Sequence, residues 1–586
     1  MVKKTYILPL AAAALLMSGC IDEIEPTDVA SKSQISKDSE SFAKLVNGLK
    51  SKMIQVDTYG STSGSFAEAM ADWGYPCYML WRDVMLDGMP TTGTSWNYQY
   101  SLEACTRLTT YSGYPYYYYY SFINNANRIL SASSEESASE TVKQQLAITR
   151  TYRAMSYMQL SMMYEFYKTG IDGLDQQAAA EGVMGLTVPL VDENTTADES
   201  KNNPRAPFYK MYRFIHNDLA IAEENIDGYS RSEKNDINAD VVNGLMARFW
   251  LNLGTRFLRN PDDLDTQLQH ESDADGCKSL GITNAADCFT NAAEYADKVI
   301  NAGYSPVTED QWHDVSTGFN TANQAWIWDI KYSSTEQTPR YWMTYTGLFA
   351  VEPSWAFPAY TKEYRCISKR LFDKMPAADW RKTTWVDPAD AGLTEVPSDK
   401  YQTTLKDETT TSKEESSNWS RLPAYASLKF RSAGADMDSE EKGLLTAMPL
   451  MRVEEMYFIK MEAALRTSGI GEAKSQLESF LNTYRYTGGS YTCSATTAED
   501  FISEMIDQKY IEFWAEDVLF ADYKRLGLQV NRKFDDTNYL EVYQLKSKSG
   551  YAAPWLNFYI SDTEKSFNQA VAMNPDPTSY ISQYCK

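Results

Sequence analysis

The chain has 586 residues, a formal net charge of −24 and 13% aromatic residues, among them 41 tyrosines. Disordered chains lack aromatic residues, so this composition excludes disorder as the global state. The negative charge repels phosphate backbones and no basic stripe interrupts it, which argues against nucleic acid as a partner.

Residues 1–19 are predicted to form a lipoprotein signal peptide. Lys3 and Lys4 precede the apolar run Ile7–Met17, which is too short to span a bilayer. The run ends in "LMSGC", which resembles a bacterial lipobox and implies cleavage before Cys20 and lipid on its thiol. An ordinary signal peptide with a chance cysteine is the alternative. No later apolar run approaches the length of about 20 residues that a membrane helix needs, so we expect a lipid anchor and no membrane-spanning segment.

Residues 20–40 are predicted to be an acidic linker behind the lipid. The stretch "IDEIEPTD" carries Asp22, Glu23, Glu25 and Asp28. In Bacteroidetes-type lipoproteins an acidic stretch at this place resembles a surface-export signal, and a plain solvated linker is the alternative. We therefore expect the protein to face the cell exterior.

The cysteines and histidines do not build a recognisable catalytic or metal site. The sequence has eight cysteines, and seven remain once Cys20 is set aside for the lipid. Because seven is an odd number, they cannot all form disulfide pairs. Cys277 and Cys288 flank a polar loop and could pair in an oxidising compartment. The three histidines lie far apart, and the sequence contains no HExxH, GxSxG or GxxxxGK[ST] motif. We predict no metal and no cofactor, and we leave a structural calcium ion open without predicting one.

Helical periodicity predicts four helical hairpins. In Val242–Leu253 the apolar residues follow the i, i+3, i+4, i+7 pattern of one buried face. Hairpins of this size resemble tetratricopeptide repeats, which predicts a mainly α fold. The predicted pairs are 41–54 with 116–130, 141–166 with 207–226, 242–253 with 289–304, and 451–466 with 471–484.

Five consecutive tyrosines, Tyr116 to Tyr120, follow Pro115 and begin one of these helices. Because successive helical residues are turned by about 100°, the five rings cannot form one flat platform. We expect a packed helix in which Tyr117 alone faces outward. The shared buried face is predicted to carry Tyr116, Tyr119, Phe122, Ile123, Ala126, Ile129 and Leu130.

Between Trp312 and Ser439 the pattern changes to loops rich in Pro, Gly, Ser and Thr. "QAWIWDIKY" alternates apolar and polar residues and predicts a strand, and "AYASLKF" looks similar. We therefore predict one domain over residues 41–586. Its helical scaffold covers 41–60, 110–304 and 445–530, and the loop-rich ligand region covers 61–109 and 305–444.

Several segments resemble the SusD/RagB-like outer-membrane lipoproteins of Bacteroidetes. "YYYYYSFINNANRIL" is similar to the family's early helix, with Tyr120, Ile123 and Asn127 at comparable places. "MPLMRVEEMYFIKMEAALRTSG" is close to another family segment, and "VVNGLMARFWLNLG" and "FYISDTEKSFNQAVAMNP" also match. The helix near 505–527 departs from the pattern at Gln508, Asp517 and Leu519, which bears on the subfamily more than on the fold.

The resemblance implies a nutrient-binding protein of the cell outer membrane that is not an enzyme. Such a protein would capture oligosaccharides and pass them to a SusC-like TonB-dependent channel. Three alternatives stay open: capture of peptides or other nutrients by a RagB-like member, a purely structural helical adaptor, and a lipid-anchored glycoside hydrolase. The hydrolase would need two carboxyl groups about 5–10 Å apart in a cleft.

Two kinds of residue are candidates for the site. The charged residues Arg452, Glu455, Glu462, Glu512 and Glu516 stand at helical spacings in apolar segments, which favours structural ion pairs over catalysis. Sugar binding instead favours Trp and Tyr mixed with short polar side chains on loops. Trp312 with His313 is a weaker candidate, for which a packed turn is favoured. Two ring-rich segments have this composition, residues 72–100 and residues 340–355. The predicted ligand-binding residues are Trp73, Trp81, Asp83, Trp96, Asn97 and Tyr98 in the first segment, and Tyr341, Trp342 and Trp355 in the second.

Overall fold

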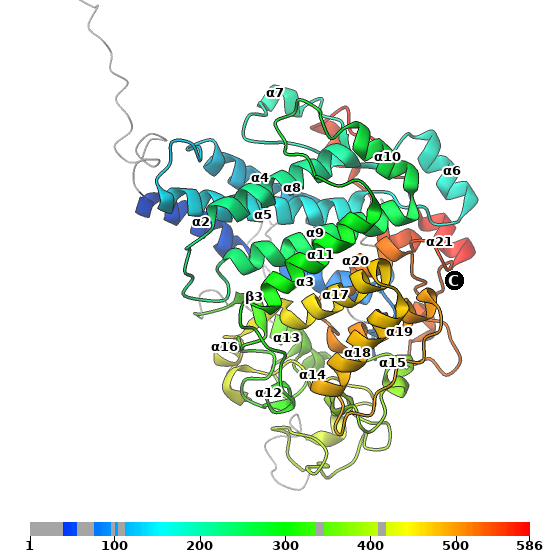
Figure 1. The fold of residues 1–586 in the computed structure, drawn as a ribbon. Helices are drawn as coiled ribbons and strands as arrows, with labels where there is room; N and C mark the ends of the chain where they lie inside the picture. Colours follow the sequence, from blue (N-terminus) through cyan, green and yellow to red (C-terminus); the bar gives the residue numbers. More distant parts are fainter. Residues whose placement is uncertain (1–38, 55–74, 95–99, 103–111, 335–344, 408–417) are drawn as a thin grey trace, which may run out of the picture.

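A computed structural model describes residues 39–54, 75–94, 100–102, 112–334, 345–407 and 418–586 (Figure 1). The described part is mainly helical, as predicted. The predicted signal peptide, most of the acidic linker and Cys20 lie outside the described residues, and the predicted domain boundaries stay a prediction. The longer helices are α2 (Ser39–Lys52), α3 (Tyr75–Val84), α4 (Gly113–Leu130), α5 (Glu140–Tyr164), α8 (Phe208–Asn225), α9 (Ala239–Arg259), α11 (Ala285–Ile300), α17 (Val453–Thr467), α18 (Ile470–Tyr484) and α19 (Ala498–Glu512).

These helices pack as consecutive antiparallel neighbours, which confirms the tetratricopeptide-like scaffold. The α5–α8, α9–α11 and α17–α18 pairs are the predicted ones, and α11 also packs on α17, so that the hairpins form one continuous array. The predicted first pair is only partly correct, because α2 packs on α5 as well as on α4, and α4 packs on α5. Shorter helices connect or flank this array: α6 (Asp172–Ala180), α7 (Ala197–Ser200), α10 (Pro261–Gln269), α20 (Leu519–Leu526) and α21 (Thr578–Tyr584).

The tyrosine run lies on α4, as predicted. Tyr116 and Tyr119 are buried, but Tyr117 and Tyr120 are both half-buried, so the prediction that Tyr117 alone faces outward is only partly correct. Tyr118 is also buried, because α2 covers the side of α4 that the pattern left open: its hydroxyl donates to the Lys52 carbonyl at 3.0 Å. The run is therefore scaffold and not a flat binding platform.

Strand β3 (Trp326–Lys331) is the predicted strand and pairs antiparallel with β4 (Ala447–Arg452). A second small sheet pairs β1 (Leu186–Pro189) with β2 (Arg205–Pro207). The second predicted strand, "AYASLKF", is wrong as a regular element. Ala426 and Ser427 make only isolated bridges, to Cys366 and Trp385, because Tyr425 adopts a left-handed backbone with φ of 69° that interrupts the extended chain.

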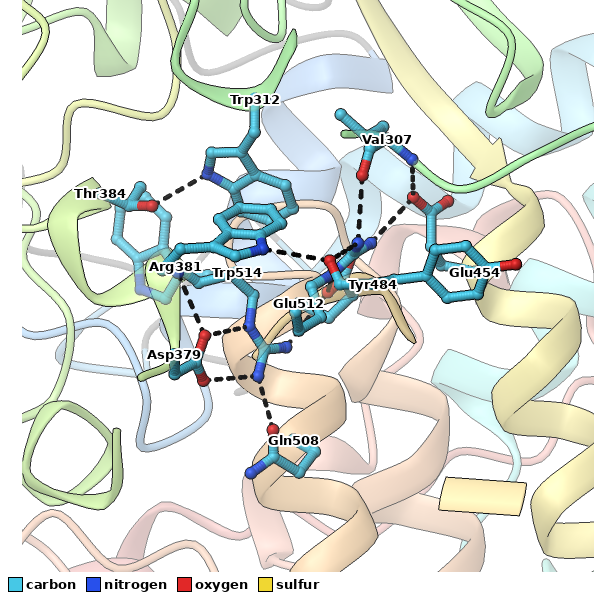
Figure 2. Close-up of polar contacts among 12 residues, drawn as sticks. Val307, Trp312, Asp379, Arg381, Thr384, Glu454, Tyr484, Gln508, Glu512 and Trp514 are labelled. Atoms are coloured by element: carbon cyan, nitrogen blue, oxygen red, sulfur yellow. Dashed lines mark hydrogen bonds and ion pairs between the residues drawn. The ribbon is translucent and has the colours of Figure 1, made fainter. Parts of the chain in front are cut away.

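The loop-rich half carries short helices: α12 (Glu309–His313), α13 (Tyr345–Phe349), α14 (Phe357–Thr361), α15 (Lys369–Lys374) and α16 (Glu440–Gly443). The weaker candidates Trp312 and His313 are buried in α12, where the Trp312 Nε1 donates to Thr384 Oγ1 at 2.9 Å, so the favoured packed turn is confirmed (Figure 2).

A buried ion-pair network fastens this half to the helices. Arg381 in the loop-rich half donates to Asp379 and to Gln508 of α19, and Glu454 of α17 accepts from the Val307 backbone N–H (Figure 2). The predicted structural role of the charged residues is confirmed. Their pairs are Arg452 with Glu512 and Glu516, Arg248 with Glu455, and Arg525 with Glu462.

The suggested Cys277–Cys288 bridge is wrong, because both residues are free thiols in the structure. Cys288 is buried in α11 at the point where Gly254 of α9 approaches it closely. Cys277 lies instead in the preceding loop, where its carbonyl accepts a hydrogen bond from Arg213 Nη2 at 3.0 Å. The two side chains are therefore held by different neighbours.

Candidate functional site

The two predicted loop-rich regions, 61–109 and 305–444, meet in the fold, although the second stretch at the contact follows the predicted ring-rich segment 340–355. Residues 88–93 run antiparallel to residues 360–368, with a bridge between Thr91 and Arg365. The Cys366 N–H donates to the Pro90 carbonyl at 2.8 Å, and the Thr92 N–H donates to the Tyr364 carbonyl at 3.1 Å. We call these two stretches the loop junction.

One face of the loop junction is shaped by a glycine. A Cβ added to Gly93 would lie 2.3 Å from Glu363 Cγ, so any larger residue here would displace the Glu363 side chain from its present place. Helix α14 ends just before, at Lys362, whose left-handed φ of 63° turns the chain toward Glu363. The turn leaves the Tyr360 ring 69% exposed beside the junction.

A third segment, around Arg532, holds the chain on either side of residues 88–93. Arg532 is fully buried, and its guanidinium donates to the carbonyls of Val84, Leu86 and Tyr100 at 2.6, 2.8 and 3.2 Å. A cation at this place satisfies the carbonyls that the end of α3 leaves without helical partners. It thereby fixes both ends of the chain stretch that contains Gly93.

The Tyr543 ring completes this support. It packs against the Tyr100 ring with centroids 5.2 Å apart. Burial raises the pKa of Tyr543 to about 12, and the Glu363 carboxylate adds to the effect. Tyr543 therefore stays a neutral phenol next to the junction at physiological pH.

Comparison with known proteins agrees with this architecture. Residues 305–584 match the model of the SusD family. A SusD-like carbohydrate binding protein from Bacteroides vulgatus ATCC 8482 superposes with a TM-score of 0.62 at 18% identity, over 91% of this chain and 97% of that one. Residues 305–584 therefore match the SusD family, and the solved structures show a SusD-like fold over 91% of the chain.

Further SusD-superfamily structures share the fold. One from Bacteroides thetaiotaomicron VPI-5482 has a TM-score of 0.59 at 16% identity, covering 92% of this chain and 99% of its own. One from Parabacteroides distasonis ATCC 8503 has a TM-score of 0.58 at 15% identity, covering 91% and 98%. Among curated proteins, no sequence matches this chain.

Within this SusD-like fold, the predicted site residues fall into three groups. Trp355 is half-buried, with its ring packed over Gly443. Trp81 and Asp83 are each only 1% exposed, so the prediction that they contact a ligand is wrong for this conformation. The remaining predicted residues lie outside the described parts of the chain and stay predictions: Trp73, Trp96, Asn97, Tyr98, Tyr341 and Trp342.

Trp81 and Asp83 are buried because they lie on α3, a helix inside a stretch that was predicted to be loop. Every residue of Tyr75–Val84 is buried, so the helix has no polar face and its periodicity was hidden. Asp83 accepts from the Asp517 N–H at 2.9 Å, and burial raises its pKa well above the ordinary range. Both residues therefore belong to the core.

Sequence reasoning missed Tyr360, Glu363, Arg532 and Tyr543. Tyr360 follows Trp355 closely, and its place between Pro358 and a charged turn could have drawn attention to it. Arg532 and Tyr543 have no local signal, because they act on residues more than 400 positions earlier.

The chemistry available at the loop junction is that of binding. The junction offers the exposed Tyr360 ring on a hydrogen-bonded backbone, while the neighbouring Glu363 is buried. Among the described residues, no group of three or more His, Cys, Asp or Glu side chains is arranged to hold a metal ion. A search of the same residues finds no helix long and apolar enough to cross a membrane.

Proposed function

We propose that the protein captures glycans at a surface built around the loop junction and delivers them to a SusC-like TonB-dependent channel. Lipid on Cys20 would hold it on the outer face of the outer membrane. The observation that carries this proposal is the backbone pairing of residues 88–93 with residues 360–368, which joins the two loop-rich regions and includes the exposed Tyr360. Trp96, Asn97 and Tyr98 directly follow that junction in sequence, and Tyr341 and Trp342 come shortly before it.

The physical argument rests on what a sugar offers. A pyranose has an apolar C–H face and a rim of hydroxyls, and a tyrosine ring gives flat apolar area with few torsions to freeze. Because the backbone ladder between residues 88–93 and 360–368 already orders the loops, binding would cost little additional conformational entropy. A rigid junction with exposed rings therefore favours sugar capture.

The family supports the same conclusion. The SusD family is associated with the outer membrane and with nutrient binding, and one solved structure of this fold is called a SusD-like carbohydrate binding protein. A hydrolase would need two carboxyl groups in a cleft. The carboxylates Glu454 of α17 and Glu512 of α19 are instead buried in ion pairs with arginines, which supports binding rather than hydrolysis.

A glycan and peptide array with the chain lacking residues 1–20 tests the proposal. We expect binding to one or more glycans. Tyr360→Ala should weaken it about tenfold or more, the loss of about 1.4 kcal/mol, and Trp96→Ala should weaken it without lowering the melting temperature. Tyr584→Ala removes another exposed ring and serves as the matched control.

Three results would contradict the proposal. Binding to peptides alone would assign the surface to peptide capture. Sustained release of sugar products would identify a hydrolase. Undiminished glycan affinity in both Tyr360→Ala and Trp96→Ala would remove the loop junction from the site.

A further inference from the structure

A cavity of about 490 Å³ lies on the outer face of α4, away from the loop junction. Its walls are α4, the connection from β1 to β2 that contains α7, and residues 564–568. Figure 1 shows α4 and α7 at the upper side of the molecule, and α14, which carries Tyr360, at the lower side. The volume lies within the range of about 300–1,000 Å³ that small-molecule sites occupy. We call it the α4 cavity.

The walls of the α4 cavity are fixed before any ligand arrives. The Asn568 side-chain amide makes two hydrogen bonds to the backbone of Asn203. Its Nδ2 donates to the Asn203 carbonyl at 2.5 Å, and its Oδ1 accepts from the Asn203 N–H at 3.1 Å. On the opposite wall, Asn127 Nδ2 donates to the Val191 carbonyl at 3.2 Å. Three segments that are distant in sequence are thereby held in one arrangement.

A buried hydroxyl in the lining has no hydrogen-bond partner. Tyr116 is 3% exposed and lines the α4 cavity, and its hydroxyl makes no hydrogen bond of ordinary geometry within the described parts of the chain, although the Glu564 carboxyl group is its polar neighbour. A hydroxyl that folding removes from water is normally paired, and each exception calls for an explanation. A hydroxyl group of a ligand in the cavity would supply that partner.

The Glu564 carboxyl group lies in the same lining. Burial raises its pKa, and the neighbouring Tyr116 hydroxyl opposes the shift. Arg128 lines the same cavity, but within the residues that the structure describes Glu564 forms no ion pair with it, and its polar neighbour is the Tyr116 hydroxyl. A carboxylate and a guanidinium that do not bind each other are both available to hydroxyl groups.

Aromatic surface is available as well. Phe567 is 70% exposed at the edge of the cavity, and the half-buried Tyr117 ring lies in its lining. The charges in the lining are mixed, with Asp192, Glu193 and Glu564 against Arg128 and Lys201. The lining therefore has no excess of positive charge that would select an anion, and the rings would stack on an apolar face.

We propose that the α4 cavity is a second binding site, for one or two rings of an uncharged saccharide. The ligand would stack on Phe567 and Tyr117, and its hydroxyls would pair with the Tyr116 hydroxyl and the Glu564 carboxylate. A half-enclosed cavity with a buried unpartnered hydroxyl suits a small polyhydroxylated molecule better than a flat protein surface. This site does not depend on the loop junction, so either proposal can fail while the other stands.

Saturation-transfer NMR on the chain lacking residues 1–20 tests the inference. The probes are glucose, galactose, mannose, N-acetylglucosamine, maltose, cellobiose and lactose. The measurement uses the Tyr360→Ala variant, so that signal from the loop junction is weakened. We expect transfer from at least one sugar, weakened about tenfold or more by Phe567→Ala and by Tyr116→Phe, the loss of roughly one hydrogen bond or stacking contact. Tyr584→Ala is the matched control for loss of an exposed ring.

Tyr116→Phe also separates a ligand role from a structural one. Because the hydroxyl has no partner in the described structure, its removal should leave the melting temperature unchanged or raise it. A clear fall in melting temperature would mean that the hydroxyl stabilises the fold, and would overturn the proposal. Absence of transfer from every probe, or transfer that neither variant reduces, would overturn it too. Glycan-array binding by the wild type would in that case still support the loop junction.

Discussion

Arg485 binds Glu512 through two parallel hydrogen bonds. Its Nε donates to Oε2 at 2.7 Å and its Nη2 donates to Oε1 at 2.8 Å, and both side chains are fully buried. Arg381 and Arg452 also contact the same carboxylate, at 3.1 and 3.2 Å. Burial alone would raise the pKa of Glu512, but the three guanidinium groups outweigh it and hold the pKa well below its ordinary range.

We predict that Glu512→Gln destabilises the protein by about 3–5 kcal/mol, because removing one member of a buried ion-pair group leaves the others uncompensated. Urea unfolding measures the change. Glu40→Gln is the matched control: Glu40 pairs with Lys44 on the exposed side of α2, and its removal should change stability by no more than about 0.5 kcal/mol. Equal effects of the two substitutions would contradict the structural role of the network.

Asp329 predicts a pH dependence of stability. It lies on β3 with 2% of its surface exposed, and its Oδ1 has no hydrogen-bond partner among the described residues. Burial raises the pKa of Asp329 to about 7, against partial compensation by Lys331 and Arg231. As the pH rises above the unfolded-state pKa of about 3.9, the unfolded chain releases this proton first, so stability is lost up to a pH of about 7.

Asp329→Asn stays neutral at every pH and should remove this loss. We expect the variant to be more stable than the wild type by up to about 4 kcal/mol near pH 8, and to show no such gain near pH 4. Urea unfolding at the two pH values measures the difference, with the exposed Asp399→Asn as control. A gain that is the same at both pH values would show that Asp329 is not the titrating group.

The sequence predicted those elements whose signal is local. The stripe of apolar residues on α4 indicates the face that the structure buries, and the alternation in β3 predicts the strand, although the structure buries both of its faces. The loop junction has no such signal, because Pro90 and Cys366 are about 275 residues apart in sequence and no local pattern connects them. Arg532 likewise acts on α3 from the other end of the chain, and no spacing rule connects the two.

Trp81 shows how local composition misleads. Rings mixed with Arg82 and Asp83 suggest a binding loop, yet Arg82 pairs with Asp517 and the Trp81 ring lies edge-on to Tyr78 at 5.0 Å. The same residue types serve a sugar site or a core, and only the neighbours supplied by distant segments decide between the two.

We therefore predict that Trp81→Ala destabilises the protein by about 3–5 kcal/mol, the usual cost of removing a buried tryptophan side chain. Tyr360→Ala removes an exposed ring and should change stability by no more than about 0.5 kcal/mol. Urea unfolding of both variants checks the contrast. A Trp81→Ala variant with wild-type stability and weakened glycan binding would show that Trp81 contacts the ligand and is not a core residue.

The free thiols give a prediction that needs no ligand. Burial raises the pKa of Cys288 to about 12 and that of Cys277 to about 11, so both are protonated near pH 8, and Cys288 is also buried away from solvent. We expect iodoacetamide to leave Cys288 unmodified in the folded chain and to alkylate both residues once the chain is unfolded in urea without reductant. Peptide mass mapping measures the two reactions, and a parallel sample with reductant is the control. Because no disulfide joins Cys277 and Cys288, the reductant should not change which of them is alkylated. A peptide that contains both residues and that only the reductant separates would show that they form a disulfide.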